Sequence, residues 1–206
     1  NIDNVADIAI AAKFRNNGQV CISPNRFYIQ ENVKDEFINA FINRAKKLKI
    51  GNGMDEGVNL GPLTTSKRLE EIEKLVDTTK KEGAEVLMGG KRPSGFNKGF
   101  YYEPTVFDKV EDNFTIMKEE PFGPLVPMLA FKTFDEVIER ANDNDLGLCS
   151  YLYTNSMDKA NRGSELLETG CVAVNTGAVA IAEAPFGGIK QTCLLYTSDA
   201  ADDGVG

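Results

Sequence analysis

The sequence predicts an α/β domain whose largely parallel sheet is flanked by helices. Short apolar runs typical of strands alternate along the chain with longer segments whose apolar residues recur at helical spacing. The chain has 206 residues, of which 42% are hydrophobic, so it is long enough to build one substantial core. Repeated alternation of strands and helices favours parallel strands joined by helical crossovers.

Helices dominate the first half of the chain. An apolar helical segment at 5–12 is followed by a helix over 33–48 with one apolar face. Thr65 or Ser66 can cap a further helix, and Gly83 is its expected end. The other elements expected here are strands at 26–29 and 85–88, a glycine-rich loop at 51–53, and a surface loop at 91–99.

The second half continues the alternation. An extended segment is expected at 101–107 and a buried strand at 125–131. Thr133 is a suitable N-cap for the next helix, whose apolar residues are Phe134, Val137, Ile138 and Ala141. Strands at 149–153 and 170–174 then bracket a helix at 156–168.

Charge and hydropathy exclude several classes of function. The net charge is −8 with no compensating basic patch, which argues against nucleic acids and anionic membranes as partners. The apolar runs are much shorter than a membrane span and no leader pattern opens the chain, so we expect a soluble, cytoplasmic protein. The first residue is Asn1 rather than methionine, which suggests a start inside a longer protein.

The chain contains no histidine, which limits the chemistry it can perform. Ser-His and Cys-His dyads, His-ligated zinc and histidine proton shuttles are all excluded. The four cysteines, at 21, 149, 171 and 193, show no C-x-x-C pair, so we expect no metal site and no disulfide framework. A cysteine nucleophile would have to use a carboxylate, a lysine or a water as its base.

Cys21 is the candidate nucleophile. An apolar helix leads through Gly18 to Cys21, and Pro24 and Asn25 follow, so the cysteine lies in a turn. A cysteine in such a turn can present its sulfur to a cleft while its backbone N–H points at the reacting carbonyl. The alternative is a buried structural cysteine, which is the commoner use of this residue and our expectation for Cys149 and Cys171.

Glycine-rich segments give weaker signals. The loop at 51–53 is not a dinucleotide fingerprint, because it follows a helix and lacks the third glycine and the later acidic residue. Gly187 and Gly188 could be a simple turn, since glycine is the default residue for unusual backbone geometry.

Four segments together form a recognisable pattern: FRNNGQVC at 14–21, KEEPFGP at 118–124, NTG at 175–177 and PFGGIK at 185–190. Their order and separations resemble those of the aldehyde dehydrogenase superfamily. The resemblance covers residues 1 to about 191 and implies the catalytic domain of that fold. It also implies oxidation of an aldehyde to a carboxylate through a thiohemiacetal and thioester on Cys21, with NAD or NADP as cofactor.

Within that resemblance, Glu120 and Phe122 are the cofactor-binding residues. A carboxylate can accept hydrogen bonds from both ribose hydroxyls, and an aromatic ring can support a flat nicotinamide. The alternative is a solvated acidic turn with a phenylalanine in the core. The family's general-base glutamate and oxyanion-hole asparagine belong to a preceding cofactor domain, which is the partner that this chain would lack. Homo-oligomerisation of the full-length protein is implied in the same way.

Arg15 is the candidate substrate-binding residue. Its planar guanidinium suits a carboxylate, and the alternative is an ordinary surface or structural ion pair. The Phe-Arg pair most resembles the branch of the family that acts on succinate semialdehyde. Residues 178–182, however, offer no hydroxyl where several members of that branch have a serine. Glutarate semialdehyde or another ω-carboxylated aldehyde therefore remains an alternative, as does a non-catalytic binding or interaction module.

Three regions are expected along the chain. Residues 1–20 would end the cofactor domain and approach the nucleophile, and residues 21–191 would form the catalytic domain. From Thr192 on the sequence departs from the family pattern, so 192–206 is expected to be a non-native or disordered tail. Ser23 stands where some relatives have a second cysteine, so a local disulfide switch is not expected.

Overall fold

A computed structural model describes residues 1–192 of the chain. The chain divides into two compact units, Asn1–Lys132 and Thr133–Gly206. The boundary expected between residues 20 and 21 stays a prediction.

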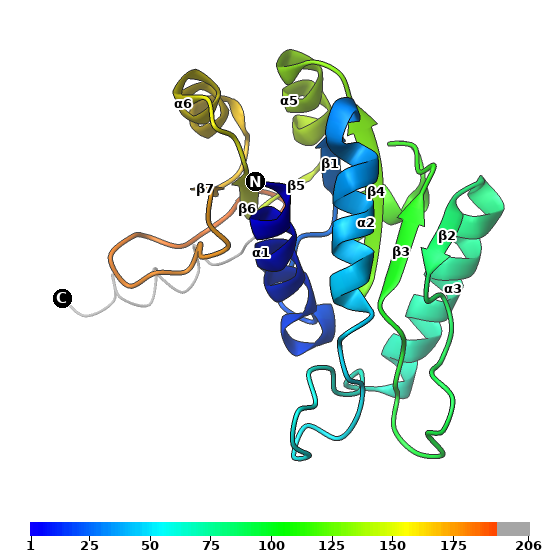
Figure 1. Cartoon of the computed structure of the whole chain (residues 1–206). Helices are drawn as coiled ribbons and strands as arrows, with labels where there is room; N and C mark the ends of the chain where they lie inside the picture. Colours follow the sequence, from blue (N-terminus) through cyan, green and yellow to red (C-terminus); the bar gives the residue numbers. More distant parts are fainter. Residues whose placement is uncertain (193–206) are drawn as a thin grey trace. The chain divides into compact units, whose positions relative to one another are not determined.

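A four-stranded sheet forms the centre of the first unit, in the order β1-β4-β3-β2 (Figure 1). Its strands are β1 (Phe27–Gln30), β2 (Glu85–Met88), β3 (Thr105–Asp108) and β4 (Leu125–Phe131). The central strand β4 pairs in parallel with both β1 and β3, whereas β2 is antiparallel to β3. The largely parallel sheet expected from the sequence is thus confirmed.

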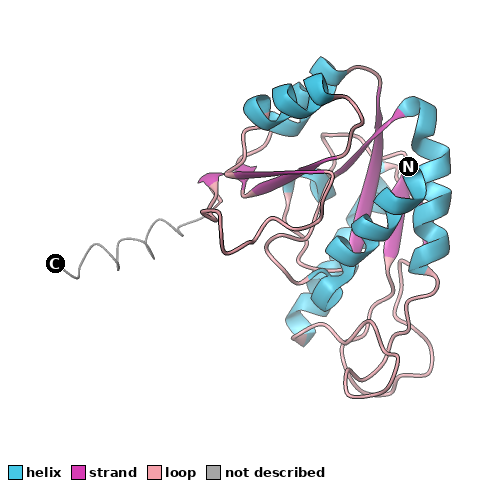
Figure 2. Ribbon diagram, turned by 60° about the vertical axis from the view of Figure 1, so that its left-hand side comes forward, coloured by secondary structure: helices cyan, strands magenta, loops and turns pink. Residues whose placement is uncertain are grey.

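Helices cover both faces of this sheet, because successive strand residues point to opposite sides. The helices of the unit are α1 (Ile2–Phe14), η1 (Arg15–Gly18), η2 (Glu31–Val33), α2 (Lys34–Ala45), α3 (Ser66–Glu82) and α4 (Thr115–Lys118). Val106 packs in one buried cluster with residues of α1 and α2, whereas its neighbour Phe107 packs in the other with α3. Figure 2 shows the strands between these layers of helices.

Helix ends follow the capping residues that the sequence provides. The Thr65 side chain accepts a hydrogen bond from the backbone N–H of Arg68, which caps the start of α3. Gly83 ends the same helix with φ 116°, a left-handed conformation that glycine adopts without strain. Both residues were predicted from the sequence. Loops 46–65 and 89–104 extend from the same end of the unit (Figures 1 and 2).

The second unit combines two helices with short strands. Its elements are α5 (Phe134–Asn142), β5 (Leu146–Gly147), β6 (Cys149–Leu152), α6 (Met157–Leu166), β7 (Cys171–Val174) and β8 (Ile189–Lys190). Strands β6 and β7 are parallel, with Cys149 paired to Cys171, and β5 is antiparallel to β8. Thr133 caps α5 through a complete capping box with Glu136, which confirms its expected role.

Several details differ from the sequence expectations. In place of the helix expected at 33–48, the short η2 ends at Val33 and α2 follows it up to Ala45. The extended segment expected at 101–107 forms a strand only from Thr105. The short elements α4, β5 and β8 were not expected, because segments of two to four residues carry too little periodicity to detect. Thr192 accepts a hydrogen bond from the backbone N–H of Gly147 at 2.7 Å, and the remainder of the expected tail, 193–206, lies outside the described residues.

Candidate active site

The turn that carries Cys21 begins with three residues in the left-handed region. Asn16, Asn17 and Gly18 have φ of 47°, 57° and 75°. Asparagine tolerates this conformation better than most residues with a side chain, and glycine adopts it freely. The Asn-Asn-Gly sequence therefore suits an abrupt reversal of the chain at the end of α1.

Buried side-chain amides fix this turn to the neighbouring loop. The Asn17 Nδ2 donates to the carbonyl of Gly61 at 3.0 Å, and the Gln19 Oε1 accepts from the backbone N–H of Thr64 at 2.9 Å. The Ser23 hydroxyl, also buried, donates to the Lys13 carbonyl at 3.1 Å. Cys21 itself is exposed, so its sulfur is accessible while the flanking backbone is held.

Arg15 lies at the start of η1, directly after the last residue of α1. Its side chain is exposed, and within residues 1–192 no carboxylate forms an ion pair with it. Among the described residues, Arg15 therefore has no carboxylate partner for the structural ion pair that was the alternative.

The segment around Glu120 and Phe122 connects α4 to the central strand β4. Phe122 has φ 46° and is half-buried, whereas Glu120 is exposed. A Cβ on Gly123 would lie 2.5 Å from the Ile72 side chain, so this segment packs tightly on α3. Backbone in the left-handed region at a bulky residue is uncommon, and such conformations concentrate at functional sites.

Direct backbone contact joins the Cys21 turn to the Glu120 segment. A Cβ on Gly18 would lie 2.3 Å from the carbonyl oxygen of Gly123, which leaves no room for any side chain. Glycine at position 18 is therefore required both by its φ and by this approach. Two segments that are far apart in the sequence, and that hold three of the predicted site residues, thus lie side by side.

Opposing effects act on the Glu120 carboxyl. Loss of hydration raises its pKa above the ordinary value, and the positive charges of Arg68 and Lys13 offset this rise only in part. Lys13 is completely buried, and loss of hydration lowers its pKa to about 7 against the opposing influence of Glu120. Each of these two groups thus favours the charged form of the other.

Next to Glu120 lies a groove of about 400 Å³ between α3, α4 and the segment before β4. Arg68, Glu71 and Glu119 contribute charged groups to its lining, and Ile72 and Leu75 contribute apolar ones. Arg68 also forms an ion pair with Glu71 at 3.0 Å. The groove beside Glu120 therefore has a mixed polar and apolar lining.

Comparison with known proteins shows which family the chain belongs to. A sequence model of the Aldehyde dehydrogenase family matches residues 1–199. The chain belongs to the aldehyde dehydrogenase family. Among its relatives, the mitochondrial succinate-semialdehyde dehydrogenase of Oryza sativa subsp. japonica is 41% identical over 94% of this chain and 36% of its own length. The glutarate-semialdehyde dehydrogenase of Pseudomonas putida is also 41% identical, over 94% of this chain and 40% of its own.

Solved aldehyde dehydrogenase structures share this fold. The succinate-semialdehyde dehydrogenase of Burkholderia pseudomallei superposes with a TM-score of 0.90 and 39% identity, over 94% of this chain and 40% of that one. A 3,6-anhydro-L-galactose dehydrogenase in complex with NAP gives the same TM-score with 40% identity, over 92% and 40% of the two chains. The chain thus spans about two fifths of the length of its aldehyde dehydrogenase relatives.

The other two aldehyde dehydrogenase segments lie in the second unit. Asn175, with φ 56°, binds Thr154 twice: its Nδ2 donates to the Thr154 carbonyl and its Oδ1 accepts from the Thr154 N–H, both at 2.9 Å. The Tyr153 hydroxyl donates to the Thr176 carbonyl at 3.2 Å. These bonds fix the Asn-Thr-Gly loop to the end of β6.

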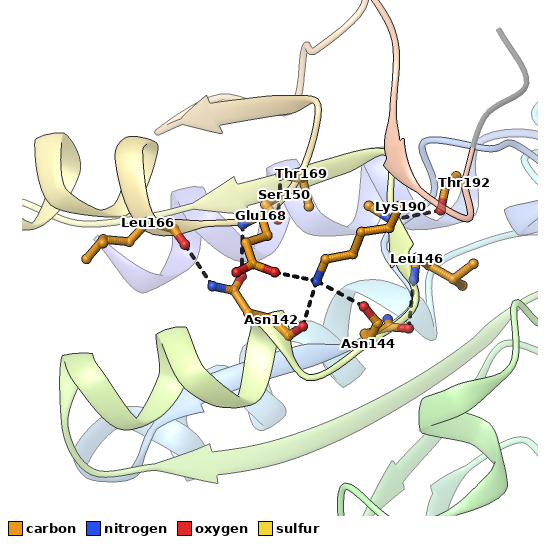
Figure 3. A network of polar contacts seen from close by, with 10 residues as sticks. Asn142, Asn144, Leu146, Ser150, Leu166, Glu168, Thr169, Lys190 and Thr192 are labelled. Carbon is orange, nitrogen blue, oxygen red and sulfur yellow. Dashed lines mark hydrogen bonds and ion pairs between the residues drawn. The ribbon is translucent and has the colours of Figure 1, made fainter. Parts of the chain in front are cut away.

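Lys190 anchors the end of the late glycine turn (Figure 3). Its Nζ donates to the carbonyls of Asn142 and Asn144 at 2.7 and 3.0 Å, and forms an ion pair with Glu168 at 2.7 Å. A Cβ on Gly170 would lie 2.0 Å from the Gly187 carbonyl oxygen, so this turn is also held by close backbone contact. The turn at 185–190 is therefore a fixed element of the second unit.

Sequence reasoning missed two charged residues of the site, Lys13 and Arg68. Helical spacing could have found the first, since Ala6, Ala9 and Lys13 follow one another at three and four residues on the buried face of α1. Arg68 gave no such signal, because it occupies the first turn of α3 and its relation to Glu120 is long-range.

The described part of the chain contains no cluster of three or more potential metal ligands and no helix able to cross a membrane. Among residues 1–192 the cysteines at 21, 149 and 171 form no disulfide, and Cys193 lies outside that range. Cys149 and Cys171 are half-buried on paired strands.

Proposed function

We propose that the full-length protein containing this chain oxidises an ω-carboxylated aldehyde, first of all succinate semialdehyde to succinate, with NAD or NADP as cofactor. Cys21 is the nucleophile, Glu120 and Phe122 bind the cofactor, and Arg15 binds the distal carboxylate of the substrate. A preceding cofactor domain and self-association of the full-length protein belong to the same proposal, and both are implied by the resemblance to the family.

The observation that carries this proposal is the backbone contact between Gly18 and Gly123. It supports a site in which the exposed Cys21 and the Glu120 segment act on one substrate. A nucleophile and a cofactor-binding group have to be held at fixed separation for reaction, and a contact between two glycine backbones provides that constraint.

In the proposed reaction, the Cys21 thiolate attacks the aldehyde carbon and forms a thiohemiacetal whose oxyanion accepts a hydrogen bond from the Cys21 backbone N–H. Loss of hydride then converts this adduct into a thioester. Water cleaves the thioester, which releases the carboxylate and regenerates the thiol. The flanking hydrogen bonds of Asn17, Gln19 and Ser23 keep the turn in place throughout.

The residues present fit the nicotinamide half of NAD or NADP. When bound, this cofactor accepts the hydride. The exposed Glu120 carboxylate offers two acceptor oxygens for vicinal ribose hydroxyls, and the half-buried Phe122 ring offers an apolar face for a flat heterocycle. The nearby positive charges of Arg68 and Lys13 favour the ionised form of this carboxyl and partly offset the rise in its pKa that burial causes.

Replacing Cys21 tests the covalent mechanism. The chain is fused behind the preceding region of the rice relative, and NAD(P)H formation from succinate semialdehyde is followed by absorbance. We expect Cys21→Ser to reduce kcat by at least about 1000-fold, because a neutral hydroxyl is a far weaker nucleophile than a thiolate.

Cys171→Ser is the matched control, since Cys171 lies on β7 outside the proposed machinery, and it should keep its turnover. A Cys21→Ser fusion with undiminished turnover would rule out the covalent mechanism. If the native fusion binds cofactor but never turns over, the alternative of a non-catalytic binding module is correct.

The exposed position of Arg15, without an ion pair among the described residues, supports the carboxylated substrate. Arg15→Ala loses a bidentate charged contact. It should cost about 2 to 4 kcal/mol of transition-state stabilisation, calculated from the ratio of kcat/KM values for succinate semialdehyde. Butanal, which has no carboxylate, should be nearly unaffected, and Arg15→Lys should restore activity only in part.

Equal losses for both aldehydes would mean that Arg15 supports the turn rather than the substrate. Glutarate semialdehyde is the second candidate substrate, because the relative that acts on it is as similar to this chain as the rice protein is. The ratio of kcat/KM for the two semialdehydes in the native fusion decides between them.

A further inference from the structure

An unexplained feature of the first unit is a lysine without any exposed surface. Lys13 is the penultimate residue of α1, and its relative exposure is 0%. Lysine is almost never fully buried unless it is paired, because burial removes the hydration of its ammonium group. Its depressed pKa, about 7, reflects the same loss of hydration.

Lys13 contacts the Cys21 turn through both its backbone and its side chain. Its carbonyl accepts a hydrogen bond from the buried Ser23 hydroxyl at 3.1 Å, and its Nζ donates to the Asn25 Oδ1 at 3.3 Å. Ser23 and Asn25 follow Cys21 by two and four residues. Lys13 thereby joins the helix that enters the Cys21 turn to the segment that leaves it.

The charge of Lys13 also acts on the second segment of the site. Among the described residues, Glu120 is the ionisable group whose negative charge opposes the lowering of the Lys13 pKa by burial. In return, Lys13 lowers the pKa of Glu120. A single side chain thus bonds to the nucleophile turn and attracts the carboxylate that we assign to the cofactor.

Packing alone gives no reason for a lysine at this position. Methionine has a similar length, fills irregular space, and would carry no cost of desolvation. Replacing buried ionic groups by apolar residues of similar volume is often neutral or stabilising. A buried ammonium group that packing does not require points to a role in the site.

We propose that Lys13 is a positioning residue, which holds the Cys21 turn through Asn25 and orients the Glu120 segment through its positive charge. Lys13 acts through these two segments rather than on the reacting atoms. The consequence for catalysis rests on the proposed function, whereas the structural coupling does not.

Backbone amide exchange in the 206-residue chain tests the coupling independently of any activity. In Lys13→Met, peptides covering 19–25 and 119–123 should both exchange about fivefold faster, the factor expected for one lost hydrogen bond or charge contact. A peptide covering 37–45 of α2 serves as the internal control and should be unchanged. The Tm should be equal to that of the native chain or higher.

Asn25→Ala is the second variant, and it separates the two contacts. It removes the acceptor for Lys13 but leaves the charge, so exchange should rise about fivefold in 19–25 and stay unchanged in 119–123. If Lys13→Met lowers the Tm and accelerates exchange everywhere, the result for Asn25→Ala is decisive. Faster exchange in 19–25 alone supports the proposal, and unchanged exchange in 19–25 overturns it. Unchanged exchange of both peptides in Lys13→Met also overturns it.

Kinetics in the fusion protein test the consequence. Lys13→Met should raise the KM for the cofactor about tenfold, and the effect should be smaller than additive with Glu120→Gln, because both changes remove the same interaction. Fully additive effects would overturn the link to Glu120. A native fusion without turnover would instead refute the proposed function and leave the exchange result standing.

Discussion

Different kinds of interaction stabilise the first unit and the second unit internally. In the first unit, buried apolar side chains form clusters on both faces of a four-stranded sheet. In the second, α5 buries none of its residues and α6 buries only Gly163. Its loops are fixed instead by hydrogen bonds from Asn142, Asn175 and Lys190 to backbone atoms. Packing should therefore determine stability in the first unit, and individual polar contacts in the second.

The largest expected effect comes from Phe41, which lies on α2 and is completely buried in the apolar cluster that α1, α2 and the sheet share. Its ring centroid lies 5.9 Å from that of Phe14 and 5.8 Å from that of Phe27. Phe41→Ala should lower the free energy of unfolding by about 3 to 5 kcal/mol, measured by urea denaturation. Phe134→Ala in α5 should cost about 1 kcal/mol, since Phe134 is only half-buried. Similar losses for both would remove the contrast between the units.

Gly18→Ala should have the next largest effect, because it strains the backbone and separates the two site segments. The φ of 75° is unfavourable for alanine, and the new Cβ would overlap the Gly123 carbonyl oxygen. We expect a loss of about 2 to 3 kcal/mol in unfolding free energy and loss of turnover in the fusion protein. The control is Gly53→Ala, whose Cβ would meet no atom within 4 Å. A fully active Gly18→Ala fusion would show that the contact is dispensable.

A pH titration should reveal the buried ammonium group of the first unit. The folded-state pKa of Lys13, about 7, lies below its ordinary value of 10.5, so the unfolded chain binds more protons between these values. Stability should therefore rise by about 2 kcal/mol from pH 7 to pH 9 relative to Lys13→Met, whose titration lacks this contribution. Parallel pH profiles of the two proteins would mean that Lys13 is hydrated in solution.

The smallest expected effect concerns Lys190 in the second unit. Lys190→Met removes two bonds to backbone carbonyls and one ion pair, so exchange of the amides in 185–190 should accelerate and local stability should fall by about 1 to 2 kcal/mol. Lys159→Met on α6 is the matched control and should have no effect. If Lys190→Met lowered the unfolding free energy of both units by the same amount, the effect would not be local to the second unit as proposed.

Local signals explain what could be predicted from the sequence. Thr65, Gly83 and Thr133 mark helix ends because capping depends on residues within one turn. The family segments identified Arg15, Cys21, Glu120 and Phe122 as a set, and their catalytic roles stay predictions. The Gly18–Gly123 contact could not be derived from either segment, because a close approach between distant backbones leaves no periodic pattern. Lys13 was missed for another reason: the apolar helical segment expected at 5–12 ends one residue before it, although its spacing from Ala6 and Ala9 places it on the same buried face.

The meeting of Gly18 and Gly123 also has a consequence for how the site could vary among related sequences. Because two main chains touch there, the separation between them does not depend on the size of any side chain. Exposed neighbours such as Arg15 can then be exchanged for residues that suit other aldehydes without altering that separation. Substrate preference would then differ between related proteins without any change in the reaction geometry.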